Sequence, residues 1–204
     1  EFELIVEKCR QLPVSNNIGE HEDDYIINLF FTVLDYQMKV FTIDKAIIYY
    51  RTNHWNEVRT FNHLKSLFSK YSTTREANTS LAQYLWGNNH WKRMCQLRHL
   101  VEYFESIGVI SQEELKKWAK KSDFKNDFKG KVCGLSLTVY QFLMMRLGKE
   151  TIKPDVRVEK FIKAIIGKKV SQDELIKTLE LVATQLKMKP RDLDLRIWEY
   201  QGNL

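Results

Sequence analysis

Apolar residues recur along this chain at the three- and four-residue spacing that places them on one face of a helix. Phe2, Ile5, Val6 and Cys9 show this spacing near the start, and Pro13 stops the pattern. No segment alternates between apolar and polar residues for long enough to predict a strand. Only 8 glycines and 3 prolines interrupt the chain, so the pattern predicts an all-α fold with short loops.

Turn signals and capping residues divide the helical pattern into separate predicted helices. They are expected over residues 1–12, 25–38, 42–50, 56–70, 80–86, 90–106, 111–120, 138–147, 154–166, 172–186 and 190–200. Acidic residues 22–24 suit a helix N-terminus, and Thr42 is expected to cap the helix that follows it. Ser111 and Glu114 have the spacing of a capping box, and Gly148 is expected to end an apolar helix.

Length and charge narrow the class of protein. The 204 residues, 44% of them apolar, suffice for one large domain or two small ones. The net charge is +6, and residues 116–131 hold seven lysines against Asp123 and Asp127, a local excess of +5. Such a cluster favours a polyanion partner such as nucleic acid. The alternative interpretation is a solvated helix face and loop.

The cysteines argue against a metal centre. Cys9, Cys95 and Cys133 lie far apart in the sequence and form no CxxC pair, so neither a zinc site nor an iron–sulfur cluster is expected. We expect no metal and no other cofactor, and the sparse thiols suggest a reducing compartment. No apolar run is long enough to cross a membrane, and no signal peptide is recognised at the start of the sequence.

Residues 130–138 carry the most informative local pattern. An apolar residue, any residue, glycine, an apolar residue and a small residue follow one another from Val132 to Ser136, which predicts a tight hairpin between two helices. Gly134 permits the positive φ that such a turn requires, and the exposed backbone amides of the turn can bind a DNA phosphate without reading sequence. The alternative interpretation is an ordinary corner between helices.

The segment after the hairpin extends this pattern into a family resemblance. An apolar helix, Gly148, a short loop and Asp155 follow the hairpin, and residues 144–161 read MMRLGKETIKPDVRVEKF. This order resembles the helix-hairpin-helix–Gly/Pro–Asp (HhH-GPD) motif of DNA glycosylases of the endonuclease III and MutY type. Further similarity lies in residues 29–50, where Gln37 matches a helix-ending glutamine, and in residues 86–100 and 193–200.

The chain departs from the family pattern at two points. Bifunctional glycosylase/lyases carry a lysine just after the hairpin, where this chain has Leu137 or Thr138. Without that amine, Schiff-base lyase chemistry is not expected. The cysteine cluster of the iron–sulfur members is also missing, so the resemblance indicates a cluster-free branch.

The resemblance implies a two-lobed helical fold and a role for each matched residue. One lobe would span residues 22–147 and hold the hairpin, and the other would combine 1–21 with 148–204 and carry Asp155. Asp155 would be the catalytic carboxylate, although it can also serve only as a helix N-cap. Gln37 would fill the gap left by a flipped base, or else be an exposed helix-end residue. Contacts to DNA would come from Lys129, Lys131, Gly134, Ser136 and Thr138.

The implied function is a monofunctional DNA N-glycosylase of base excision repair. It would act as a monomer on double-stranded DNA, in a nucleoid-associated cytoplasmic or a nuclear location, and would leave an abasic site without cutting the strand. The alternatives are a non-catalytic DNA-binding protein of the same fold and a helical protein-interaction module. The base that is removed depends on pocket shape, which the sequence does not reveal.

Overall fold

The computed structural model describes residues 1–15, 24–35 and 38–202. Across these residues the regular structure is helical and contains no strand, which confirms the all-α prediction. The elements in chain order are α1 (Phe2–Arg10), α2 (Tyr25–Leu34), α3 (Val40–Asn53), α4 (Phe61–Phe68), α5 (Arg75–Trp86), α6 (Trp91–Ser106), α7 (Gln112–Lys121), the π-helix η1 (Phe124–Phe128), α8 (Leu137–Arg146), α9 (Val156–Ile166), α10 (Gln172–Gln185) and α11 (Pro190–Gly202). None of the described helices is long and apolar enough to cross a bilayer.

The chain divides into two compact units. Unit 1 combines Glu1–His21 with Met144–Leu204, and unit 2 is Glu22–Leu143. The division therefore falls within α8, a few residues before the boundary expected between residues 147 and 148. The hairpin belongs to unit 2 and Asp155 to unit 1.

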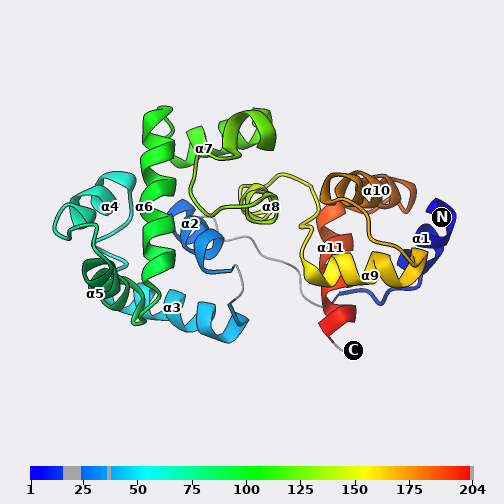
Figure 1. Cartoon of the computed structure of the whole chain (residues 1–204), viewed down its shortest axis with the longest axis horizontal. Helices are drawn as coiled ribbons and strands as arrows, with labels where there is room; N and C mark the ends of the chain where they lie inside the picture. Colours follow the sequence, from blue (N-terminus) through cyan, green and yellow to red (C-terminus); the bar gives the residue numbers. More distant parts are fainter. Residues whose placement is uncertain (16–23, 36–37, 203–204) are drawn as a thin grey trace. The chain divides into compact units, whose positions relative to one another are not determined.

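Unit 2 is built around its longest helix, α6, which packs against α2, α4 and α5 (Figure 1). Aromatic rings fill its centre. The ring of Phe30 lies edge-on to Tyr50 and to Trp86, with centroid distances of 4.9 Å and 5.6 Å. All three side chains are fully buried, and such edge-to-face pairs add to the stabilisation from buried apolar area. This core fixes α6 as the support on which the hairpin rests.

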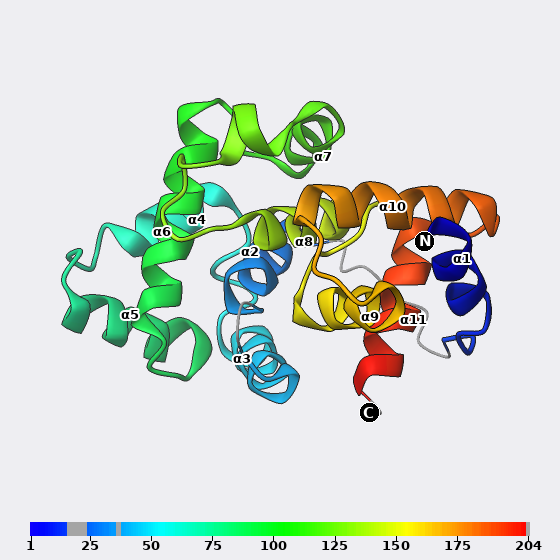
Figure 2. The same ribbon diagram turned by 45° about the vertical axis from the view of Figure 1, so that its right-hand side comes forward.

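Unit 1 brings the first helix of the chain together with the last three. Here α1 packs on α9 and α10, and α11 packs on the same two helices (Figure 2). Cys9 of α1, Leu179 of α10 and both Leu193 and Ile197 of α11 are completely buried in one core. The N-terminus of α9, where Asp155 stands, is therefore anchored by residues from both ends of the chain.

Helix ends follow the predicted capping chemistry at Asp24 and Ser111 and depart from it at Thr42. Asp24 accepts hydrogen bonds from the amides of Ile26 and Ile27, and Ser111 forms the capping box with Glu114. The prediction that Thr42 caps a helix is wrong, because α3 begins at Val40 and places Thr42 in its first turn. Val40 and Phe41 in this first turn are apolar but exposed, so they lie outside the buried face that the periodicity follows.

Candidate nucleic-acid interface and carboxylate site

The hairpin (residues 129–136) connects η1 to α8 in unit 2. The side chain of Asp123 caps η1 by accepting from the amides of Lys125 and Asn126. At the other end, the Ser136 carbonyl accepts the first helical bond of α8 from the Tyr140 amide at 3.0 Å. The Asp123 cap before η1 and the first helical bond of α8 thus set the two ends of the segment that contains the loop.

Gly134 allows the hairpin to lie against α6. Its φ is +73°, a left-handed conformation that suits glycine. Its carbonyl accepts a hydrogen bond from Nε2 of Gln96 at 3.2 Å. A Cβ atom at this position would come within 2.9 Å of the same nitrogen. The positive φ therefore favours glycine here, as the sequence predicted, and a side chain at this position would displace the Gln96 amide from its bond.

The hairpin presents backbone amides that are not used within the fold. The amides of Cys133, Gly134 and Ser136 find no acceptor among the residues that the structure describes. These three residues are exposed. Backbone N–H groups on an exposed turn are suited to donate hydrogen bonds to the oxygen atoms of an anion such as a phosphate.

Seven lysines form a basic strip that leads from α7 to the hairpin. All are exposed: Lys116, Lys117, Lys120, Lys121, Lys125, Lys129 and Lys131. The acidic residues of the same stretch face the backbone, since Asp123 caps η1 and Asp127 Oδ2 accepts from the Asp123 amide at 2.7 Å. In the described part of the chain no carboxylate pairs with Lys129 or Lys131. The charges of Lys129 and Lys131 at the hairpin end of the strip are therefore not neutralised by a carboxylate in the described residues.

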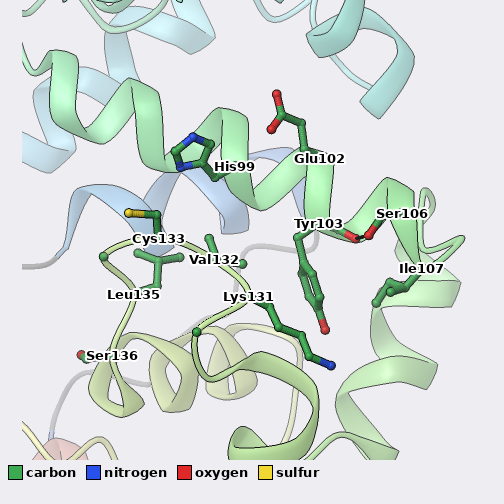
Figure 3. Close-up of a pocket in the computed structure, with 12 residues that line it drawn as sticks. His99, Glu102, Tyr103, Ser106, Ile107, Lys131, Val132, Cys133, Leu135 and Ser136 are labelled. Atoms are coloured by element: carbon green, nitrogen blue, oxygen red, sulfur yellow. Dashed lines mark hydrogen bonds between the residues drawn. The ribbon is translucent and has the colours of Figure 1, made fainter.

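A groove of about 1100 Å³ separates the hairpin from α6 (Figure 3). Helix α6 contributes His99, Glu102 and Tyr103 to its lining, and the loop contributes Lys131 and Cys133. Burial raises the pKa of Tyr103, so its hydroxyl keeps its proton and donates to the backbone carbonyl of Asp127. This bond ties the segment before the hairpin to the same helix that Gln96 contacts.

Asp155 stands at the N-terminus of α9 in unit 1. Its Oδ1 accepts from the amides of Arg157 at 2.9 Å and Val158 at 3.1 Å, which confirms the predicted N-cap. Its Oδ2 makes no hydrogen bond in the described part of the chain and lies 3.9 Å from Nζ of Lys153. One carboxylate oxygen is thus structural, and the other is available for chemistry.

The loop before Asp155 is held by contacts from α10 and α11. The Lys153 amide donates to Oδ1 of the buried Asp194 at 2.8 Å, and Gln172 Nε2 donates to the Pro154 carbonyl at 3.2 Å. The side chains of Lys153 and Asp155 are only 13% and 19% exposed. The carboxylate is therefore positioned in a partly desolvated site beside a cation, where electrostatic interactions are stronger than in water.

The structure gathers most of the predicted contact residues but not all of them. Lys129, Lys131, Gly134 and Ser136 lie together on the exposed hairpin, whereas Thr138 is half-buried in the first turn of α8. Gln37 lies outside the described residues. Among the residues that the structure describes, no group of three His, Cys, Asp or Glu side chains could hold a metal ion.

Two residues near these sites escaped the sequence analysis. Gln96 holds the hairpin on α6, and Lys153 faces the carboxylate. Lys153 carried an available signal, because it stands two residues before Asp155. Gln96, His99 and Tyr103 follow one another at helical spacing on one face of α6. The hydrogen-bond partner of Gln96, however, is 38 residues away in the sequence.

Comparison with known proteins yields one match. Residues 87–202 match the family described as "Domain of unknown function (DUF8548)". This span is more than half of the chain and contains both the hairpin and Asp155. No curated protein and no solved structure matches the chain.

Proposed function

The chain belongs to the DUF8548 family, and from its own residues we propose that it is a monofunctional DNA N-glycosylase with an HhH-GPD fold. It would hydrolyse the bond between an abnormal or mispaired base and its deoxyribose. The substrate would be double-stranded DNA, encountered in the nucleoid or the nucleus. The resemblance of residues 144–161 to the HhH-GPD motif suggests this chemistry.

The observation that carries the proposal is the divided use of the Asp155 carboxylate. Oδ1 is fixed by two backbone amides, so the side chain cannot rotate away, while Oδ2 makes no hydrogen bond in the part of the chain that is described. A catalytic group needs such preorganisation, because its position must be set before the transition state forms. The partly desolvated setting strengthens the interaction of Oδ2 with a nearby positive charge.

The reaction follows from the charge that develops on the sugar. As the bond from C1′ to the base nitrogen breaks, the base takes the electron pair and C1′ becomes an oxocarbenium-like cation. The Asp155 carboxylate stabilises that cation and accepts a proton from the water that adds to C1′. The base must first leave the helical stack, which a duplex-binding enzyme achieves by flipping the nucleotide.

The hairpin and the basic strip supply the grip on DNA. Exposed amides at Cys133, Gly134 and Ser136 would bind a phosphate, and Lys129 and Lys131 would neutralise its neighbours. Such contacts hold the duplex without reading its sequence. They fit an enzyme that must inspect lesions in any sequence context.

The product is expected to be an abasic site with an intact strand. Leu137 and Thr138 occupy the positions where bifunctional relatives carry the Schiff-base lysine. Neither side chain can form a covalent imine with the sugar. Water is therefore the nucleophile in the proposed reaction.

The decisive experiment is an excision assay on duplexes that carry a panel of lesions and mismatches, with alkali to reveal abasic sites. Asp155→Asn keeps an oxygen that can cap α9 but removes the negative charge, so we expect excision to fall by about 100-fold or more while DNA binding is kept. Ser171→Ala is the matched control, since it removes the N-cap of α10 in the same unit and leaves Asp155 intact. Equal excision by wild type and Asp155→Asn would exclude Asp155 as the catalytic carboxylate.

A second function is favoured by the same cap. Because Asp155 already stabilises α9 through two hydrogen bonds, it needs no catalytic role to explain its presence. A non-catalytic DNA-binding protein of the same fold would then bind duplexes with strong salt dependence and excise nothing across the panel. Salt-insensitive or absent DNA binding would instead favour a protein-interaction module.

A further inference from the structure

Two of the three cysteines are in unit 2, next to the hairpin. Cys95 is half-buried on α6, and Cys133 is exposed on the hairpin itself. The third, Cys9, is completely buried in the core of unit 1, and burial raises the pKa of its thiol to about 12. Cys9 is therefore inert, and thiol chemistry is confined to the pair at the hairpin.

A hydrogen bond joins the two segments that carry these cysteines. Gln96 follows Cys95 and donates through Nε2 to the carbonyl of Gly134, which follows Cys133. The hairpin and α6 thus meet at the residues directly after each cysteine. Figure 3 shows Cys133 on the loop beside the turn of α6 that carries His99, one turn after Cys95. The two cysteines therefore lie on segments that meet at this bond, close enough for a charge on Cys133 to act on Cys95.

The two thiols differ in a way that suits stepwise oxidation. Burial raises the pKa of Cys95, and a negative charge on Cys133 raises it further, against the opposing effect of Arg98. Exposed Cys133 can meet a dissolved oxidant, whereas Cys95 holds its proton. An exposed first thiol and a sheltered second thiol are the usual arrangement of an attacking and a resolving cysteine.

We propose that Cys95 and Cys133 form a reversible disulfide that fastens the hairpin to α6 under oxidising conditions. The Cys133 thiolate attacks hydrogen peroxide, the O–O bond breaks, and sulfenic acid forms as the departing hydroxide takes a proton to become water. The sulfur of Cys95 then displaces the sulfenic oxygen, which leaves as a second water with the Cys95 proton. Two thiols are oxidised, one peroxide is reduced, and a thiol reductant reverses the change.

The hairpin has the freedom that bridging requires. A disulfide needs Cα atoms roughly 4.4–6.8 Å apart, so the loop must close onto α6 along the direction of the existing Gln96 contact. Gly130 and Gly134 flank the cysteine at positive φ values of 76° and 73°, and no other atom would meet a Cβ at Gly130 within 4 Å. The space at Gly130 leaves room for the backbone to adjust before Cys133, while the Gln96 bond at Gly134 keeps the far side of the loop against α6.

The consequence for binding depends on the proposed function. Closing the loop withdraws the amides of Cys133, Gly134 and Ser136 from solvent, and with them the phosphate site. We expect oxidation to weaken duplex binding by roughly tenfold or more. Under this proposal the protein would release DNA in the presence of peroxide and bind it again after reduction.

The test treats the full chain with hydrogen peroxide, blocks the remaining thiols with N-ethylmaleimide, digests it with trypsin and analyses the peptides by mass spectrometry. We expect a disulfide between peptides 94–98 and 132–146 in a monomeric fraction, lost after dithiothreitol. Cys95→Ser and Cys133→Ser should each abolish it, and Cys9→Ser should not. This readout needs no DNA, so it is independent of whether the chain is a glycosylase.

Three other results would overturn the proposal. They are a disulfide that joins two chains, Cys133 oxidised to sulfinic acid without a bridge, and both cysteines left unmodified. The effect on binding is measured separately, by titrating a duplex with reduced and oxidised protein. Cys95→Ser serves as the control, since it should bind the duplex when reduced and show no drop from disulfide closure after peroxide.

Discussion

Loss of two hairpin lysines gives a quantitative test of the DNA interface. The perturbation is the double substitution Lys129→Ala and Lys131→Ala, which removes two exposed cations that no carboxylate neutralises in the described residues. Neither side chain is part of a core, so the fold should be unaffected. Any change in DNA binding then reports on phosphate contacts alone.

The size of the effect follows from counterion release. Each phosphate contact on B-DNA contributes about −0.9 to the slope of log K against log salt, so two contacts contribute about −1.8. If binding to the two proteins converges near 1 M salt, the variant should bind about 30-fold more weakly at 0.15 M salt and about 200-fold more weakly at 0.05 M. The loss should be the same for unrelated duplex sequences, because phosphates carry no sequence information.

Fluorescence anisotropy with a labelled duplex at several salt concentrations measures both the affinity and the slope. The matched control is Lys8→Ala with Lys177→Ala, which removes the same charge from exposed positions on α1 and α10. We expect the control to keep the wild-type slope within about 0.5 units. Thermal unfolding of all three proteins confirms that the substitutions leave the fold intact.

An unchanged slope in the hairpin variant would refute this reasoning, since it would mean that Lys129 and Lys131 touch no phosphate. An equal loss of affinity in the Lys8→Ala, Lys177→Ala control would also contradict the proposed role of the hairpin lysines. Binding would then depend on net charge rather than on the basic strip.

Three further predictions concern stability. Asp155→Ala should destabilise unit 1 by about 1 kcal/mol more than Asp155→Asn, because only Asn can still cap α9; equal thermal midpoints would deny the cap its energetic role. Arg98→Met should cost about 3 kcal/mol or more in urea unfolding, because Arg98 donates to Asn78 Oδ1 and three backbone carbonyls, and a loss under about 1 kcal/mol would show that water replaces it. Bonds from the amides of Ile110 and Ser111 and the Ser111 hydroxyl lower the pKa of Glu114 below 4.5. The ionised Glu114 carboxylate therefore stabilises the folded protein above pH 4.5, and this contribution is lost as the pH falls through the lowered pKa. The thermal midpoints of wild type and Glu114→Gln should converge in acid and separate near neutrality.

The sequence could predict those features of the fold that depend on a few adjacent residues. The capping box at Ser111 and the cap at Asp155 are local, since the groups that bond lie within three residues of each other. The positive φ of Gly134 belongs to the same class. Each of these features depends on the backbone conformation and side chains of a few neighbouring residues, which the sequence contains.

Specific hydrogen bonds that hydrophobic periodicity does not record explain where a predicted helix failed. The predicted helix over 56–70 begins only at Phe61, after the Thr60 cap. The hydroxyl of Tyr50 donates to the carbonyl of Val58 and the His54 carbonyl accepts from the Val58 amide, so the chain turns where its periodicity suggested a helix. Specific bonds such as these override local propensity, and the hydrophobic pattern within 56–60 does not record them.

The candidate site shows the same limit. Sequence reasoning reached Asp155 and the hairpin lysines through a motif, but the role of Gln96 depends on a partner in another element. The polarity of α6 at Gln96, His99 and Tyr103 was visible, while the surface that it faces was not. The motif therefore led to the candidate residues themselves, whereas the residues that hold them in place became visible only in the structure.

The composition of unit 1 has a consequence for how the protein is made. Val6 of α1 and Ile197 of α11 share one core although they lie at opposite ends of the sequence. At a synthesis rate of about 5–20 residues per second, α1 waits on the order of 10–40 s for its last partner. Unit 2 is continuous in the sequence and can fold on the ribosome during that interval. The hairpin is therefore completed early, whereas the helix capped by Asp155 gains its full support only when translation has reached the end of α11.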